Sequence, residues 1–140
     1  MELGTFGAVL KYAIEIEDSA SQYYQKLAAK ASGNDQPLLN DLANGSKRNK
    51  QALERTRKME MQEMILEAIT GLDTVNYDSK FDESVDVKIG LKNALEIEGR
   101  ASKFYAESAS KLGFLGNVKK TLERLGKDRE ERGKKVKALL

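Results

Sequence analysis

The feature of this sequence that most limits its possible folds is a repeat. Residues 10–28 read LKYAIEIEDSASQYYQKLA and residues 91–109 read LKNALEIEGRASKFYAESA, with ten of nineteen positions identical and no gap. A second match, weaker and at an offset of 83 residues, aligns Leu39, Leu42, Ser46, Asn49 and Leu53 with Leu122, Leu125, Arg129, Arg132 and Val136. The pattern indicates a duplicated structural unit.

Apolar residues in these segments recur at spacings of three and four, which is typical of one face of an α-helix. We expect a helix from Thr5 to Ala31, a second from Asp35 as far as Ile69, a third from about Ser84, and a fourth after residue 116. Short turns make each consecutive pair an antiparallel hairpin.

The prediction is therefore a single all-α domain over residues 1–140. It is a four-helix bundle whose first hairpin covers residues 5–69 and whose second covers residues 84–140. A crossover at residues 70–83 joins the two hairpins.

Composition excludes several kinds of functional site. The 140 residues include no cysteine and no histidine. Disulfides, iron–sulfur clusters, thiol nucleophiles, imidazole-based zinc sites and Ser–His catalysis are therefore excluded. The sequence has no apolar run long enough to span a bilayer and no signal-peptide pattern at its start, so we expect a cytoplasmic protein without membrane contact.

The net charge is only +2, but basic residues gather in two segments. Residues 117–140 hold nine Lys or Arg against four acids, and residues 46–58 hold six against one. Solvated helix faces account for this pattern. A nucleic-acid surface is the less favoured interpretation, because aromatic residues are not interleaved with the basic ones.

Two glutamates fall on the inward stripes of the repeated helices. The stripes are Leu10, Ala13, Glu17, Ala20, Tyr24 and Leu27 in the first copy, and Leu91, Ala94, Glu98, Ala101, Tyr105 and Ser108 in the second. Counting helical rise from the turns places six polar side chains at one level, about 20–24 Å from each turn. The six are Glu17, Glu98, Ser46, Asn49, Arg129 and Arg132.

The paired "ALEIE…FY" helices and the crossover resemble the rubrerythrin branch of the ferritin-like superfamily. In that family each half supplies one glutamate from its first helix and a Glu-x-x-His pair from its second, and together they hold two iron ions. The resemblance covers most of the chain and places Glu17 and Glu98 at the first-helix ligand positions.

The second-helix positions depart from that pattern. Ser46 and Asn49 stand in one half, and Arg129 and Arg132 in the other, where the family has Glu and His. A permanent guanidinium cation repels metal ions and competes for carboxylates. We therefore expect no metal, no cofactor and no catalytic residue.

In place of the iron site we predict a buried salt-bridge network. Arg129 and Arg132 would balance the two glutamates, while Ser46 and Asn49 would satisfy the remaining polar groups. Tyr24 and Tyr105 are expected in the core, each with its hydroxyl bonded to a carboxylate. The function that follows is a metal-free interaction or structural protein.

Three alternatives remain open. A residual metal site would use Glu17 and Glu98 with nearby acids, namely Asp41, Glu54, Asp128 or Glu130. A small molecule could instead occupy the polar layer. If iron still binds, the resemblance implies a small diiron oxidoreductase that handles peroxide, oxygen or iron.

A methionine-rich segment near the end of the second helix is the candidate partner surface. Met59, Met61 and Met64 lie there among apolar residues, and methionine suits adaptable protein contacts. We expect a homodimer through this region, with packing under the crossover as the alternative.

Overall fold

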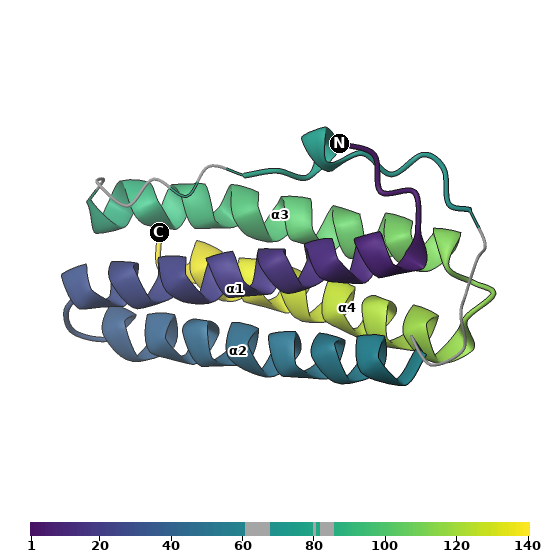
Figure 1. The fold of residues 1–140 in the computed structure, drawn as a ribbon. Coiled ribbons are helices and arrows are strands. Elements are labelled where there is room, and N and C mark those ends of the chain that lie inside the picture. Colours follow the sequence, from purple (N-terminus) through teal and green to yellow (C-terminus); the bar gives the residue numbers. More distant parts are fainter. Residues whose placement is uncertain (61–67, 80, 82–85) are drawn as a thin grey trace.

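The computed structural model describes residues 1–60, 68–79, 81 and 86–140. In these ranges the chain forms the helices α1 (Phe6–Lys30), α2 (Asp35–Glu60), α3 (Val87–Lys111) and α4 (Gly116–Ala138), with a short 3-10 helix, η2 (Thr74–Asn76). The four long helices lie side by side as a bundle (Figure 1). The α1–α2 and α3–α4 pairs pack most extensively, which confirms the prediction of an all-α bundle of two hairpins.

Local sequence signals set the helix ends. The hydroxyl of Thr5 accepts the Ala8 amide at 3.1 Å and caps α1, and the Asp86 carboxylate accepts the Ile89 amide at 2.9 Å and caps α3. Gly33, with φ of 63°, makes the turn between α1 and α2, because glycine enters the left-handed region without a steric penalty.

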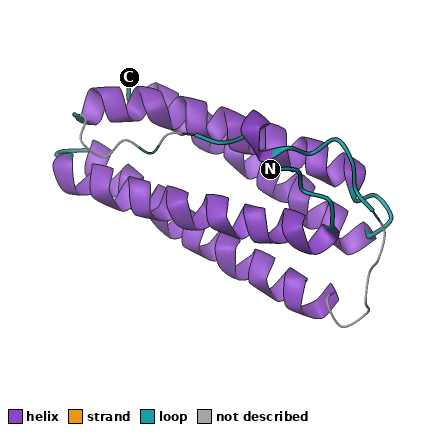
Figure 2. Cartoon of the chain, turned by 45° about the horizontal axis from the view of Figure 1, so that its top comes forward, coloured by secondary structure: helices purple, strands orange, loops and turns teal. Residues whose placement is uncertain are grey.

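The crossover determines how the hairpins face each other. It returns along the length of the bundle, so that α3 runs in the same direction as α2 and antiparallel to α1 (Figures 1 and 2). Contacts between α1 and α3 follow this direction: the Tyr12 ring meets Phe104 with centroids 5.1 Å apart, and the Tyr23 hydroxyl donates to the Gly90 carbonyl at 2.9 Å. The two hairpin turns consequently lie at opposite ends of the bundle.

The N-terminal segment is hydrogen-bonded to the chain beyond α2. The Leu3 amide donates to the Leu72 carbonyl at 2.7 Å, and the Ile69 amide donates to the Gly4 carbonyl at 3.0 Å. The expectation that the second helix continues to Ile69 is therefore wrong at its last residues: residues 68–70 are not helical, and Ile69 is buried with its amide bonded to the N-terminal segment.

Apolar side chains form two clusters, one on each side of the central polar level. Members of the first are Phe6, Leu10, Leu53, Phe104, Leu112 and Leu122, and members of the second are Leu27, Leu39, Leu42, Leu91, Ala94 and Val136. Each helix crosses from one cluster to the other at its polar residue, so the polar side chains are enclosed between two apolar regions. None of the described helices is long and apolar enough to cross a membrane.

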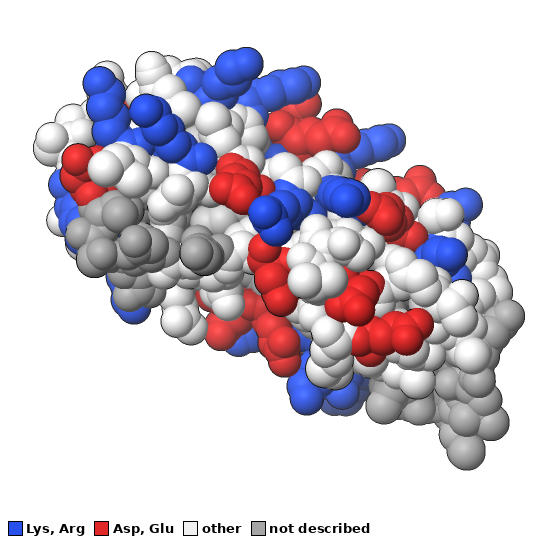
Figure 3. Space-filling view, turned by 90° about the horizontal axis from the view of Figure 1, so that it is seen from above, with Lys and Arg blue, Asp and Glu red and all other residues white. Residues whose placement is uncertain are grey.

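Charged side chains cover the outside of the bundle. On the face that is uppermost in Figure 1, basic and acidic side chains are interspersed (Figure 3). Such mixing is typical of a solvated helix surface.

Candidate functional site

The two repeated glutamates lie inside the bundle. Glu17 is fully buried and Glu98 is 1% exposed, whereas Glu15 and Glu96, two residues earlier, are exposed. All twelve residues of the two predicted inward stripes are buried, as the helical spacing requires. A buried carboxylate without a partner is costly, so what faces these two groups determines what the site can do.

Two arginines of α4 face the glutamates. Nη1 of Arg129 donates to both carboxylate oxygens of Glu98, at 3.0 and 2.9 Å, and Nη2 of Arg129 donates to Glu17. Nε of Arg132 donates to Glu98 at 3.2 Å, and its Nη2 donates to the Ser46 hydroxyl at 2.8 Å. Arg129 is fully buried and is the largest fully buried side chain of the described residues. Its planar guanidinium thus joins the carboxylates of both hairpins.

The two tyrosines bond crosswise. The Tyr24 hydroxyl, on α1, donates to Glu98 at 2.6 Å, and the Tyr105 hydroxyl, on α3, donates to Glu17 at 2.8 Å. Each tyrosine lies two helical turns from the glutamate of its own helix, so the antiparallel packing of α1 on α3 brings it to the other one.

The α2 side of the network is formed by amide and hydroxyl groups. Nδ2 of Asn49 donates to Glu17 at 3.1 Å and to Asp128 at 3.0 Å. Nη1 of Arg132 lies 4.0 Å from the Asp128 carboxylate, whose side chain is 44% exposed. The structure therefore brings together all eight polar residues singled out in the sequence and adds Asp128 at the edge.

Asp128 is the member that the inward-stripe argument missed. It lies beside the stripe of α4 and remains half-exposed. Its position four residues before Arg132 on the same helix was the available signal, because oppositely charged residues at that spacing are neighbours. The other acids considered for a residual metal site, Asp41, Glu54 and Glu130, are exposed.

Opposing effects set the charge state of Glu98 and Arg129. Burial would raise the pKa of Glu98, but Arg129 and Arg132 outweigh burial and hold that pKa below its ordinary value. Burial would lower the pKa of Arg129, but Glu17 and Glu98 raise it well above the ordinary value. Both groups therefore keep their charges inside the bundle.

The tyrosines are held neutral. Burial raises the pKa of Tyr24 well above its ordinary value, and the neighbouring Glu98 raises it further. Burial and Glu17 act in the same way on the pKa of Tyr105. Both hydroxyls thus remain proton donors to the carboxylates throughout the physiological pH range.

These residues do not fit a pair of iron ions. The Arg129 guanidinium lies in contact with both Glu17 and Glu98, which are the only first-helix carboxylates of the network. Among the described residues, no group of three or more acidic side chains is placed to hold a metal ion. Two buried carboxylates that face two guanidinium cations, with Asp128 half-exposed at the edge, form an ion-pair network and a poor ligand set for iron.

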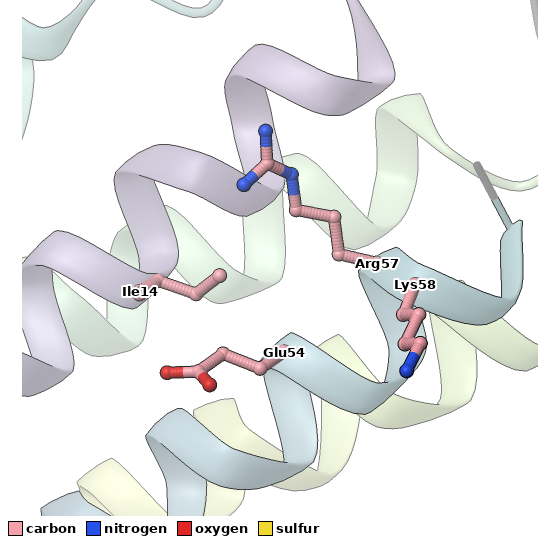
Figure 4. Close-up of a pocket in the computed structure, with 4 residues that line it drawn as sticks. All are labelled: Ile14, Glu54, Arg57 and Lys58. Atoms are coloured by element: carbon pink, nitrogen blue, oxygen red, sulfur yellow. The ribbon is translucent and has the colours of Figure 1, made fainter.

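A separate depression of about 460 Å³ lies between α1 and the end of α2 (Figure 4). Ile14, Glu54, Arg57 and Lys58 line it; the Arg57 side chain reaches toward α1, while Glu54 and Lys58 point away from each other. Among the described residues of its lining, Glu54 is the one carboxylate and stands with two cations, which together are not a metal ligand set. Of the three methionines named in the sequence, Met59 is 68% exposed, and Met61 and Met64 lie outside the described residues.

The fold is similar to a solved structure. The chain superposes on the crystal structure of a Thermotoga maritima protein described as ferritin-like and diiron-carboxylate, with a TM-score of 0.79 and 17% sequence identity, over 99% of this chain and 94% of that one. No protein-family model matches the sequence, and no curated protein matches it. At this identity the likeness establishes a ferritin-like four-helix bundle.

Proposed function

We propose that this chain is a non-catalytic, metal-free relative of the rubrerythrin-like ferritin branch that acts as an interaction or structural protein. The observation that carries the proposal is the position of Arg129, whose guanidinium bonds to the carboxylates of both Glu17 and Glu98. A buried Glu/Arg network takes the place of the diiron centre.

Charge balance supports this proposal. A diiron site supplies several positive charges to the carboxylates around it, and without those charges two buried carboxylates would face apolar surroundings. Arg129 and Arg132 supply two permanent positive charges at the same level, and bidentate contact satisfies the oxygens of Glu98. Such a network holds the helices in register without any reactive group.

The alternative is a small diiron oxidoreductase that handles peroxide, oxygen or iron. It is favoured by the similar Thermotoga maritima protein, which is described as diiron-carboxylate, and by the two carboxylates that remain. For iron to bind, Arg129 would have to leave Glu17 and Glu98, which would place an unpaired guanidinium beside a metal.

Metal analysis of the purified protein tests the proposal. The protein is produced in cells supplied with iron and manganese, purified without chelators, and measured by inductively coupled plasma mass spectrometry. We expect no stoichiometric metal. A content of about two irons per chain would overturn the proposal in favour of the oxidoreductase.

A reconstructed variant is the matched control. The combined changes Ser46→Glu, Asn49→His, Arg129→Glu and Arg132→His restore the ligand types that the resemblance implies. We expect this variant to bind iron where the natural sequence does not. A folded variant without iron would mean that these positions are not the second-helix ligand positions.

As the interaction partner we propose a second copy of this chain, bound through the methionine segment at residues 59–64. Met59 supports it, because its side chain is 68% exposed and methionine adapts readily to protein contacts. Light scattering coupled to gel filtration should give a dimer mass that falls to the monomer mass in Met59→Lys, while Lys58→Met leaves the dimer intact. A monomeric natural protein would contradict the homodimer.

A further inference from the structure

The groove between α2 and α4 contains one guanidinium nitrogen, Nη1 of Arg132, that has no hydrogen bond to any residue the structure describes. Nε and Nη2 of Arg132 bond inward to Glu98 and Ser46, but Nη1 lies 4.0 Å from Asp128, which is beyond hydrogen-bond distance. Arg132 is 3% exposed, so its two inward bonds and the surrounding helices fix the direction of Nη1. The result is a donor that is held in place before any ligand arrives.

Gly45 gives this donor access to the groove. A Cβ atom at Gly45 would lie 3.2 Å from Nη1 of Arg132 and 3.7 Å from Nη2 of Arg48. Guanidinium nitrogens from two different helices thus converge on one point above the glycine. Any larger residue at position 45 would fill that point.

Basic side chains outnumber acidic ones in the lining of the groove, although Arg132 also pairs with Glu98 inside the bundle. The groove has a volume of about 250 Å³, and its charged lining consists of Arg48, Arg132 and Lys135 against Asp41 and Asp128. Neither Arg48 nor Lys135 forms an ion pair with any residue that the structure describes. Both side chains are therefore available to pair with an anion that enters the groove.

We propose that this groove binds a single phosphate group, free or as a small phosphate monoester, with Arg48, Arg132 and Lys135 as its donors. A phosphate brings a charge of about −1.5 to −2 at neutral pH and several acceptor oxygens, which matches converging guanidinium groups. The volume is below the range of about 300–1,000 Å³ that is usual for drug-sized ligands, so a small ligand is favoured. Leu38 and Leu42 also line the groove and would contact the organic part of a monoester.

Phosphate binding is tested separately from metal binding, because Arg48 and Lys135 are exposed and lie outside the network, and only Arg132 is shared with it. Binding of inorganic phosphate is measured by ³¹P line broadening and by calorimetry, in a phosphate-free buffer of low ionic strength. We expect saturable binding with a dissociation constant of about 1 mM. The same measurement is made with glycerol phosphate, a small phosphate monoester. If it binds more tightly than inorganic phosphate, the site is assigned to monoesters.

Three variants separate the site from general surface charge. Arg48→Ala should weaken binding about tenfold, because it removes one of two converging guanidinium groups. Arg55→Ala, an exposed arginine two turns further along α2, is the matched control and should change affinity by less than about twofold. Gly45→Ala keeps every charge but covers Nη1 of Arg132, and should abolish binding while circular dichroism shows an intact helix.

Two outcomes would overturn the phosphate site. One is the absence of saturable binding by the natural protein. The other is equal weakening by Arg48→Ala and Arg55→Ala, which would mean that diffuse positive charge attracts the anion.

Discussion

The first helices of the two hairpins and the second helices contribute differently to the same centre. α1 and α3 still contribute the same pair of residue types, a glutamate and a tyrosine, and the two tyrosine bonds are reciprocal. α2 and α4 contribute different ones: Ser46 and Asn49 on one side, Arg129 and Arg132 on the other. The first helices are thus alike, whereas both cations of the network lie on α4.

This difference separates contacts that need the same residues in both hairpins from contacts that can differ between them. The tyrosine and glutamate side chains meet across the pseudo-twofold axis, so altering one copy leaves the other copy's partner unsatisfied. The residues of α2 and α4 bond to the same carboxylates from the other side. Only the total positive charge that α2 and α4 supply has to match the two carboxylates. A single arginine that touches both glutamates satisfies this requirement from one side.

The largest effect is expected from removing the shared cation. Arg129→Met takes away the guanidinium that bonds to Glu17 and Glu98 and leaves two buried carboxylates with fewer partners. The free energy of unfolding should fall by about 3–5 kcal/mol, measured by urea denaturation at pH 7. Lys127→Met, at an exposed position on the same helix, should change it by less than about 0.5 kcal/mol. A small effect of Arg129→Met would mean that the Arg129 charge does not stabilise the two buried carboxylates.

The two glutamates should differ, because the second helices do. Glu98 accepts bonds from Tyr24, Arg129 and Arg132, whereas Glu17 accepts one from Arg129 and two from neutral groups. We expect Glu98→Gln to lower the free energy of unfolding by about 3 kcal/mol and Glu17→Gln by about 2 kcal/mol.

Exposed neighbours provide the controls for this pair of changes. Glu96→Gln and Glu15→Gln lie two residues before Glu98 and Glu17, and each should be close to neutral. If Glu17→Gln lowers the free energy of unfolding as much as Glu98→Gln does, the two glutamates contribute equally to stability although their partners differ.

Acid should weaken the same pairing gradually. The pKa of Glu98 is lower in the folded protein than its ordinary value of 4.5, so the unfolded chain binds more protons near that pH. The stabilisation is fully present above pH 4.5 and is lost as the pH falls through the folded pKa. Urea denaturation from pH 7 to pH 3 should show this loss, and Glu98→Gln should flatten the profile. An unchanged profile in the variant would assign the acid sensitivity to other carboxylates.

The smallest loss of stability is expected from the two tyrosines of α1 and α3. Tyr24→Phe and Tyr105→Phe each remove one hydroxyl that donates to a carboxylate, and each should cost about 1 kcal/mol. The two values should agree within about 0.5 kcal/mol if the first helices are equivalent. Clearly unequal costs would show that the asymmetry of α2 and α4 reaches the tyrosines.

The sequence predicted the inward positions well, because burial in a helix follows spacing. Glu17 and Glu98 lie on stripes whose other members are apolar or aromatic, and their repetition in two copies made the pattern unambiguous. Counting residues from the turns also predicted that both arginines reach the level of the glutamates, since helical rise is constant.

Other contacts depend on how the helices pack, which residue spacing does not determine. The crosswise tyrosine bonds require α1 to run antiparallel to α3, and that direction is set by the path of the crossover. Asp128 joins the network from a half-exposed position that burial patterns overlook. The end of the second helix was misplaced because the Ile69 amide pairs with the N-terminal segment, a contact between residues far apart in sequence.

The position of both arginines on α4 determines which halves can associate. Two copies of the first hairpin would enclose two carboxylates and no cation, giving a charge of −2 at the centre, and two copies of the second would enclose two carboxylates and four guanidinium groups, giving +2. Only one hairpin of each kind gives an electrically neutral interior. The charges at the centre therefore disfavour the pairing of two identical hairpins.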